Sequence, residues 1–172
     1  MKLSVFTLLA LLAAVPAHAT EADVSVCFTP AQKCEPLIVQ AIDEAKSSIS
    51  VQAYVFSSFP IIHALEHAEQ RGVEVLVILD KVNDREYSAA TLLQAYNIPV
   101  WIDYEPKIAH NKVIVIDDYL TIGGSYNYTF GAENRNAENV TFIRSKAIAD
   151  EYLANWNSRL KASRVFGEKS GE

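Results

Sequence analysis

The stretch HNKVIVIDDYLTIGGSYNYT (residues 110–129) contains two apolar runs separated by a pair of aspartates. The runs predict two neighbouring β-strands, near 111–117 and 119–124, and Asp117–Asp118 predicts the turn between them. A hairpin of this kind places an antiparallel strand pair in the fold. It also brings the polar residues at its two ends to the same edge of a sheet.

Those polar residues have chemistry in common. Positions 110 and 112 of a strand project from the same face, so His110 and Lys112 present an imidazole and an ammonium side by side. Asn127 lies fifteen residues beyond Lys112 and is folded back towards them by the hairpin, and Ser125 adds a hydroxyl. A lysine, an amide and a hydroxyl around a histidine suit an anionic phosphodiester, with the histidine as nucleophile or acid–base group.

The rest of the chain alternates strand and helix patterns, without a long linker or low-complexity segment. Such alternation predicts an α/β fold with a mixed β-sheet sandwiched between helices. Further strands are predicted at 23–28, 49–56, 73–80, 98–103 and 138–144, and helices within 32–48 and near 60–71, 88–96, 128–133 and 146–162.

The N-terminus has the layout of a secretory signal peptide (1–19). Lys2 precedes an apolar core from Leu3 to Val15, and Ala17 and Ala19 occupy positions −3 and −1 of a cleavage site after Ala19. An uncleaved anchor is the alternative, although the run is shorter than the ~20 residues that span a bilayer. The prediction is one domain (20–172), periplasmic or secreted, with no stable membrane association after cleavage.

The charge balance bears on the binding partner. The whole chain carries −6, and removal of the leader with Lys2 makes it −7. Nucleic-acid binders usually have a basic surface, so the overall charge argues weakly against one, and any phosphate-binding surface must be local.

Two cysteines, Cys27 and Cys34, are separated by six residues. In an oxidising compartment this spacing predicts a disulfide. The alternative is a pair of metal ligands, but no second Cys or His pair stands at matching spacing.

HNKVIVIDDYLTIGGSYN resembles the H-x-K-x4-D-x6-G-S-x-N signature of the phospholipase D superfamily, which His110, Lys112, Asp117, Gly124, Ser125 and Asn127 match without a gap. Segments such as AKSSISVQAYVFSS and RGVEVLVILDK resemble the family's small bacterial endonuclease branch. Larger members carry the motif twice, whereas it occurs once here. His63 and His67 start no second copy and are interpreted as helix-surface residues. Because two copies form one site, the resemblance implies a homodimer with the site on its two-fold axis.

The resemblance also implies a mechanism, with neither cofactor nor metal. His110 of one subunit attacks phosphorus, and His110 of the other protonates the leaving oxygen. Lys112 and Asn127 hold the non-bridging oxygens, and Ser125 assists near the phosphate. Glu138 matches the acidic residue that orients the histidine ring, with a solvated residue before a strand as the alternative. Asp117 and Gly124 are expected to be structural.

The signature identifies the phosphodiester but not the group attached to it. The leading hypothesis is a nuclease acting on DNA, with RNA as a further substrate, and Lys107, Arg135 and Arg144 as contacts to the backbone. The runner-up is a phospholipid hydrolase, for which Trp101 and Tyr104 offer an apolar rim, unless they are core or base-stacking residues. The third hypothesis is a module that binds phosphate or nucleic acid and whose site is catalytically inactive.

Overall fold

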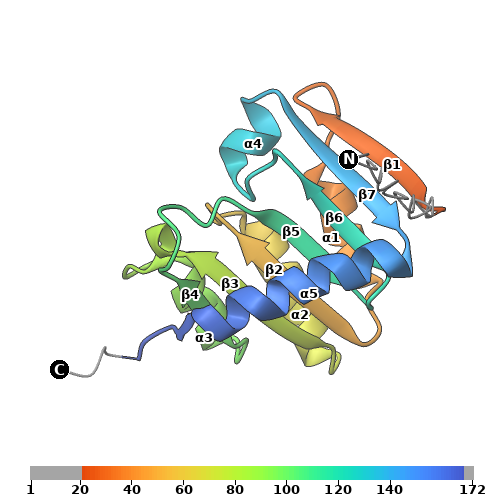
Figure 1. The fold of residues 1–172 in the computed structure, drawn as a ribbon. Helices are drawn as coiled ribbons and strands as arrows, with labels where there is room; N and C mark the ends of the chain where they lie inside the picture. The colour runs from red at the N-terminus through yellow and green to blue at the C-terminus, as the bar shows by residue number, and fades with distance from the viewer. Residues whose placement is uncertain (1–20, 169–172) are drawn as a thin grey trace, which may run out of the picture.

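The computed structural model describes residues 21–168, so the predicted signal peptide and its cleavage site lie outside the described residues. One mixed sheet forms the centre of the fold (Figure 1). Its strands are β1 (Asp23–Thr29), β2 (Ser48–Ala53), β3 (Glu74–Asp80), β4 (Val100–Asp103), β5 (Lys112–Ile116), β6 (Leu120–Gly124), β7 (Glu138–Arg144) and β8 (Arg164–Val165).

The strand order is β1-β7-β6-β5-β2-β3-β4-β8. β2, β3 and β4 are parallel, and every other neighbouring pair is antiparallel. The mixed sheet predicted from the sequence is therefore confirmed. β8, which pairs with β4, was not predicted, because two residues are too short for a recognisable pattern.

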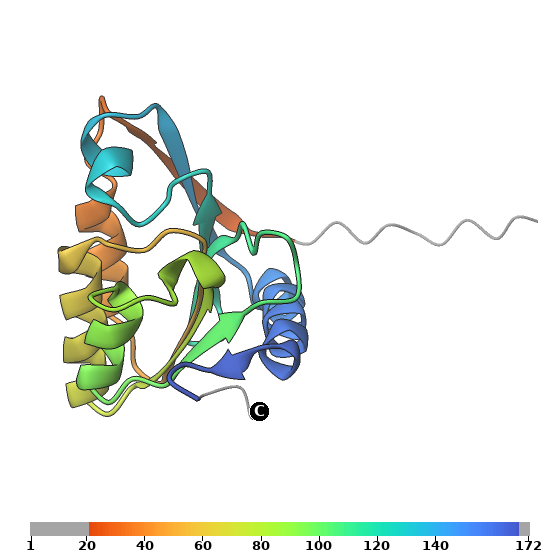
Figure 2. The ribbon, with the colours of Figure 1, turned by 90° about the vertical axis from the view of Figure 1, so that its left-hand side faces the viewer.

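Helices cover both faces of the sheet (Figure 2). α1, α2 and α3 pack on one face and α5 on the other, while α4 lies beyond the end of β6. The helices are α1 (Glu35–Asp43), α2 (Phe59–Gln70), α3 (Ala89–Ala95), α4 (Phe130–Asn134) and α5 (Lys146–Ala162), with a 3₁₀ turn η1 (Lys81–Asn83). Within residues 21–168, none of them is long and apolar enough to cross a membrane.

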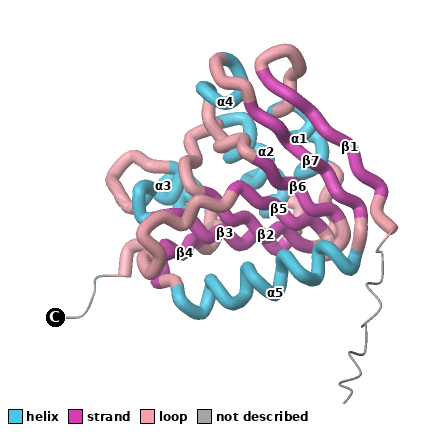
Figure 3. The backbone as a smooth tube through the Cα atoms, turned by 45° about the horizontal axis from the view of Figure 1, so that its top comes forward, coloured by secondary structure: helices cyan, strands magenta, loops and turns pink. Residues whose placement is uncertain are grey.

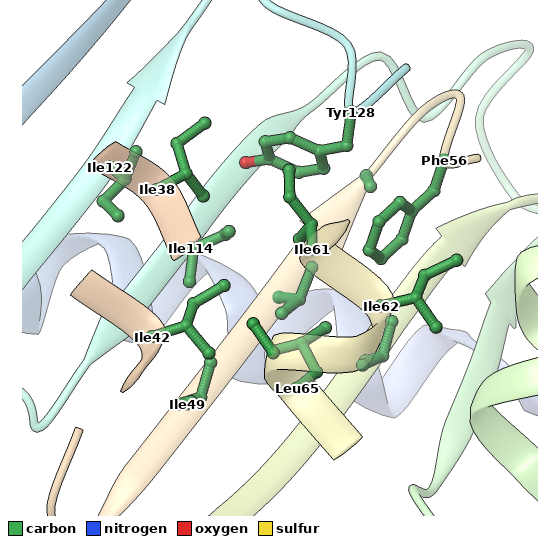
Figure 4. Packing of buried hydrophobic residues seen from close by; sticks show 14 of the residues in the cluster. Ile38, Ile42, Ile49, Phe56, Ile61, Ile62, Leu65, Ile114, Ile122 and Tyr128 are labelled. Carbon is green, nitrogen blue, oxygen red and sulfur yellow. The ribbon is translucent and has the colours of Figure 1, made fainter. Parts of the chain in front are cut away.

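The main core lies between the sheet and α1 and α2 (Figure 4). Ile38 and Ile42 of α1 and Ile61 and Leu65 of α2 are completely buried against it. Ile49 comes from β2 beneath them. These contacts arise because α1 and α2 each place apolar residues three and four apart on one face.

α5 crosses the other face of the sheet (Figure 3). The Trp156 indole N–H donates to the Val51 carbonyl at 2.9 Å. Arg159 binds the fully buried Asp103 carboxylate with two hydrogen bonds of 2.8 and 2.6 Å. A buried carboxylate needs such a partner, so this pair fixes the position of α5 on β4.

The disulfide between Cys27 and Cys34 is confirmed, with a Cα–Cα distance of 5.8 Å. It joins β1 to the residue that precedes α1. The Glu133 carboxylate of α4 accepts hydrogen bonds from the backbone N–H groups of Cys34 and Glu35 at 3.2 and 3.0 Å. The disulfide and this carboxylate together hold the start of α1 against α4.

Candidate active site

Most sequence-predicted site residues lie at one edge of the sheet. β5 begins there, β6 ends there and β7 begins there, because these three neighbouring strands are antiparallel (Figure 1). The residues at this edge are His110, Lys112, Gly124, Ser125, Asn127 and Glu138, whereas Asp117 lies at the opposite edge.

His110 and Lys112 share one aromatic neighbour, Tyr54, which follows β2. The centroids of the His110 and Tyr54 rings are 4.7 Å apart, and the Lys112 ammonium lies 5.2 Å from the Tyr54 centroid. The same ammonium donates to the His110 carbonyl oxygen at 2.8 Å. The imidazole is exposed, whereas Lys112 is only 6% exposed. A buried lysine therefore lies next to an accessible histidine.

The surroundings of Lys112 alter its acidity. Burial disfavours the charged form and lowers the pKa of the Lys112 ammonium below its ordinary value. The negative charge of Glu138 acts in the opposite direction and is the smaller effect. The two residues are thus electrostatically coupled at the site.

Glu138 is held by polar neighbours of its own. The Ser125 hydroxyl donates to one carboxylate oxygen at 2.5 Å, and the Asn136 amide donates to the other at 2.9 Å. The His110 ring forms no hydrogen bond with any residue in the described range 21–168 of its own chain. Within one chain, Glu138 therefore contacts Ser125 and Asn136 rather than the histidine that it was predicted to orient.

Gly124 is required by a close approach of two strands. Its φ is +146°, and a Cβ atom there would lie 2.2 Å from the carbonyl oxygen of Asn139. Only glycine avoids this clash. The close approach lets the Ser125 N–H donate to the Asn139 carbonyl at 3.1 Å, while the Asn139 N–H donates to the Ser125 hydroxyl at 3.1 Å.

Asn127 lies between two buried tyrosines. Tyr126 donates its hydroxyl to Glu133 at 3.1 Å, and the Tyr128 ring packs 5.4 Å from that of Phe56 (Figure 4). Both tyrosines are 2% exposed, so they anchor the backbone on either side. The Asn127 side-chain oxygen is buried and has no hydrogen-bond partner among residues 21–168. A buried side-chain oxygen without a hydrogen-bond partner calls for an explanation, and a bound ligand is one.

Asp117 anchors the hairpin turn. Its φ is +53°, and its carboxylate accepts hydrogen bonds from the backbone N–H groups of Lys46, Ser47 and Ser48 and from the Ser47 hydroxyl. Burial alone would raise the pKa of this carboxyl, but these hydrogen bonds outweigh it and lower the pKa below its ordinary value. The contacts tie the turn to the segment that leads into β2.

Sequence reasoning missed two polar residues that support the site, Asp80 and Asn83. The Asp80 carboxylate, 3% exposed, accepts a hydrogen bond of 2.6 Å from the N–H of Ala109, next to His110. The Asn83 amide donates to the Tyr54 carbonyl at 2.6 Å. The available signal was their position at the end of a buried strand, since Asp80 is the last residue of β3 and Asn83 follows it in η1.

The three residues predicted to contact the nucleic-acid backbone lie in different parts of the structure. Lys107 is exposed in the loop before His110. The Arg135 guanidinium lies 5.3 Å from the Phe130 ring centroid, on the segment between Asn127 and Glu138. Arg144 is at the far end of β7, 3.6 Å from the Asp23 carboxylate. The expectation for Arg144 is therefore wrong: the strand that begins at Glu138 carries it to the opposite edge.

Trp101 and Tyr104 do not form an apolar rim. Trp101 is half-buried within β4, and Tyr104 packs against the main core. The Tyr104 hydroxyl donates to Asp84, and burial and this hydrogen bond raise its pKa to about 12.

His63 and His67 are exposed on α2, as interpreted from the sequence. In residues 21–168, no three His, Cys, Asp or Glu side chains gather in a way that would hold a metal ion.

Comparisons with known proteins agree on one family. The family described as "Cardiolipin synthase, PLD-like domain" matches residues 38–160. The protein named Phospholipase D of Rickettsia prowazekii is 46% identical over 145 residues, which cover 84% of this chain and 71% of that protein. The human protein named Mitochondrial cardiolipin hydrolase is 32% identical over 121 residues, 67% of this chain and 45% of that one.

Among solved structures, the phospholipase D family member Nuc from Salmonella typhimurium superposes with a TM-score of 0.80. It is 32% identical, and the match covers 86% of this chain and all of that one. The similarity of fold therefore extends over the whole of that structure.

Proposed function

Because the chain belongs to the phospholipase D superfamily and is a phosphodiester hydrolase, we propose that it is an exported, metal-independent endonuclease that hydrolyses DNA, with RNA as a further substrate. The observation that carries the proposal is the placement of an exposed His110 and the buried Lys112 against one aromatic ring, that of Tyr54. Full-length coverage of Nuc, together with the resemblance to the small endonuclease branch, favours nucleic acid.

In the proposed mechanism, His110 attacks phosphorus and forms a phosphohistidine. The bond from phosphorus to the leaving oxygen breaks, and this oxygen takes a proton from a second, protonated histidine. That histidine then removes a proton from water, which attacks phosphorus and releases His110. Lys112 and Asn127 stabilise the charge that develops on the non-bridging oxygens. Lys112 supplies the positive charge that a metal ion supplies in other phosphodiesterases.

The mechanism needs two histidines, and within residues 21–168 this sheet edge carries only His110. We propose that the second histidine is His110 of another copy, so that a homodimer shares one site on its two-fold axis. The exposure of the His110 ring in the single chain supports the proposal, since a partner must be able to approach it.

Export remains a proposal that rests on the predicted leader (1–19), and the confirmed Cys27–Cys34 disulfide supports it. Disulfides persist in the periplasm and outside the cell, whereas cytosolic thiols are kept reduced. We therefore propose a periplasmic or secreted enzyme.

Phospholipid hydrolysis is the alternative function. The names of the relatives from Rickettsia prowazekii and human mitochondria favour it. The predicted rim residues Trp101 and Tyr104 offer only part of their surface to a lipid, because both are half-buried and Tyr104 packs against the main core.

The deciding experiment incubates purified protein in excess EDTA with plasmid DNA and, separately, with labelled phospholipid vesicles. We expect nicking or degradation of the DNA and no release of the lipid headgroup. His110→Ala is the control for contaminating activity and should be inactive on both substrates. Lipid hydrolysis alone would replace the nuclease proposal by the alternative. Loss of all activity in EDTA, restored by a divalent ion, would contradict the metal-independent mechanism.

A further inference from the structure

Two large aromatic side chains are exposed on segments that meet next to Asn127 of the candidate active site. Phe59 is the first residue of α2 and is 61% exposed, and Phe130 is the first residue of α4 and is 63% exposed. Burial of an apolar ring is favourable, and folding leaves both of these rings largely unburied.

The chain segments that carry the two rings are bonded to each other. The backbone N–H groups of Ser57 and Ser58 both donate to the Tyr128 carbonyl oxygen at 2.8 Å. Phe59 follows Ser58 directly, and Phe130 follows Tyr128 by two residues. Phe130 is three residues beyond Asn127, which limits their Cα separation to about 10 Å. Figure 1 shows α4 beside the sheet edge where β6 ends and β7 begins.

Helix caps fix the backbone beneath each ring. The Ser58 hydroxyl accepts the Ile61 N–H at 3.3 Å, and the Thr129 hydroxyl accepts the Ala132 N–H at 3.1 Å. Because the capped backbone is already fixed, binding has to order only the two side-chain torsion angles of each ring. Such rings provide contact area at a low cost in conformational entropy.

A positive charge accompanies Phe130. The Arg135 guanidinium lies 5.3 Å from the Phe130 centroid and forms no ion pair with any residue between 21 and 168. A guanidinium that rests on a ring and is not neutralised by a carboxylate remains available to a phosphate.

We propose that Phe59, Phe130 and Arg135 form a subsite for unpaired nucleobases next to the scissile phosphodiester, which makes single-stranded nucleic acid the preferred substrate. The inference rests on the proposed nuclease function. Bases of a single strand expose faces that stack on protein aromatic rings, whereas bases in a duplex are stacked on each other. Lys112 and Asn127 hold the reacting phosphate, the rings hold adjacent bases, and Arg135 contacts a neighbouring phosphate.

The test compares three substrates of equal length: a single-stranded DNA oligonucleotide, its duplex, and a strand of abasic residues that keeps the phosphodiesters and lacks the bases. Wild-type protein should have the lowest KM for the single strand. Phe130→Ala and Phe59→Ala should each raise that KM about tenfold, a value within the range measured for single stacking contacts. The KM for the abasic strand should change far less, and Phe130→Trp should restore the wild-type KM.

Tyr119→Ala is the matched control, because Tyr119 is 51% exposed and lies at the opposite edge of the sheet, next to the Asp117 turn. Cleavage of DNA with the same KM in Phe59→Ala, Phe130→Ala and wild type would overturn the subsite and leave the nuclease proposal standing. Equal KM increases on the single and abasic strands would also overturn it, since the rings would then not act through bases. Wild-type protein without activity on any nucleic acid would overturn the nuclease proposal and the subsite together.

Discussion

The ammonium group of Lys112 lies over the ring of Tyr54, 5.2 Å from its centroid, and the ring of His110 packs against the same tyrosine at 4.7 Å. The backbone of Tyr54 is also bonded to this region, because its N–H donates to the Asn111 carbonyl at 2.8 Å. Tyr54 therefore positions the proposed nucleophile and the proposed phosphate-binding cation relative to each other.

Replacement of this ring should impair catalysis more than substrate binding. We expect Tyr54→Leu to lower kcat about tenfold, because a cation–π contact of this kind is worth roughly 1 kcal/mol or more and the histidine also loses its support. Tyr54→Phe keeps the ring and should retain most of the activity. Steady-state kinetics on DNA would measure both variants. Equal losses in Leu and Phe variants would assign the effect to the hydroxyl instead.

Glu138 should control the alkaline limb of the pH–rate profile through Lys112. The protonated ammonium holds the phosphate, so the rate falls as pH rises through the Lys112 pKa, which burial lowers and Glu138 raises. Glu138→Gln removes the negative charge, lowers this pKa further, and should move the alkaline limb of kcat/KM to lower pH. Its loss of activity should remain smaller than that of His110→Ala.

The control for this shift is Glu151→Gln, which should leave the limb in place, because Glu151 is an exposed carboxylate on α5 that forms no hydrogen bond or ion pair with any site residue in the described range 21–168. An unmoved alkaline limb in Glu138→Gln would show that Lys112 does not set it.

Asp117 should contribute stability that depends on pH. Its pKa is lowered in the folded protein, so its stabilising effect is present above the ordinary aspartate pKa and is lost as pH falls through the folded pKa. Asp117→Asn should therefore reduce the free energy of unfolding at neutral pH by about 2 kcal/mol, typical for hydrogen bonds to a charged group. Urea denaturation should show a smaller difference in acid than at neutral pH. A difference independent of pH would contradict this origin.

The disulfide should matter for stability and not for chemistry. Replacement of Cys27 and Cys34 by serine opens a short loop, and the chain-entropy model assigns such a loop about 2.5 kcal/mol. We expect a lower urea midpoint and near-normal kcat under conditions where the variant is folded. Thiol titration of denatured, unreduced wild-type protein should find no reactive group in the cysteines, and two reactive thiols would exclude the disulfide in the exported protein.

The shared site can be tested by mixing subunits. Wild-type and His110→Ala proteins are unfolded and refolded together in equal amounts, so that about a quarter of random pairs are wild-type dimers. A mixed dimer has one histidine and lacks either nucleophile or acid. Activity should therefore fall to about a quarter of that of the same total amount of wild-type protein. Retention of about half after verified exchange would mean that each chain works with its own His110 alone.

The sequence by itself determined the local parts of this structure. The apolar runs on either side of Asp117–Asp118 specify β5, β6 and their turn, because alternation and turn residues act within a few positions. The α/β class and the cysteine pairing also follow from patterns in short windows. The spacing of His110, Lys112, Ser125 and Asn127 was sufficient to predict that these residues lie at the same edge of the sheet. The two strands of a hairpin are antiparallel, so the start of the first lies beside the end of the second.

The tertiary structure decided what surrounds these residues. Tyr54 packs against His110 because β2 lies beside β5, and Asp80 binds the adjacent Ala109 N–H from β3, the next strand along. Strand order is a long-range property that no local pattern encodes. The same strand geometry carries Arg144 away from the site. The bonds from Ser57 and Ser58 to Tyr128 bring Phe59 towards Phe130, although 71 positions separate the two residues in the sequence. Side chains distant in sequence meet through packing and hydrogen bonding of the whole sheet, and these contacts exist only after the chain has folded.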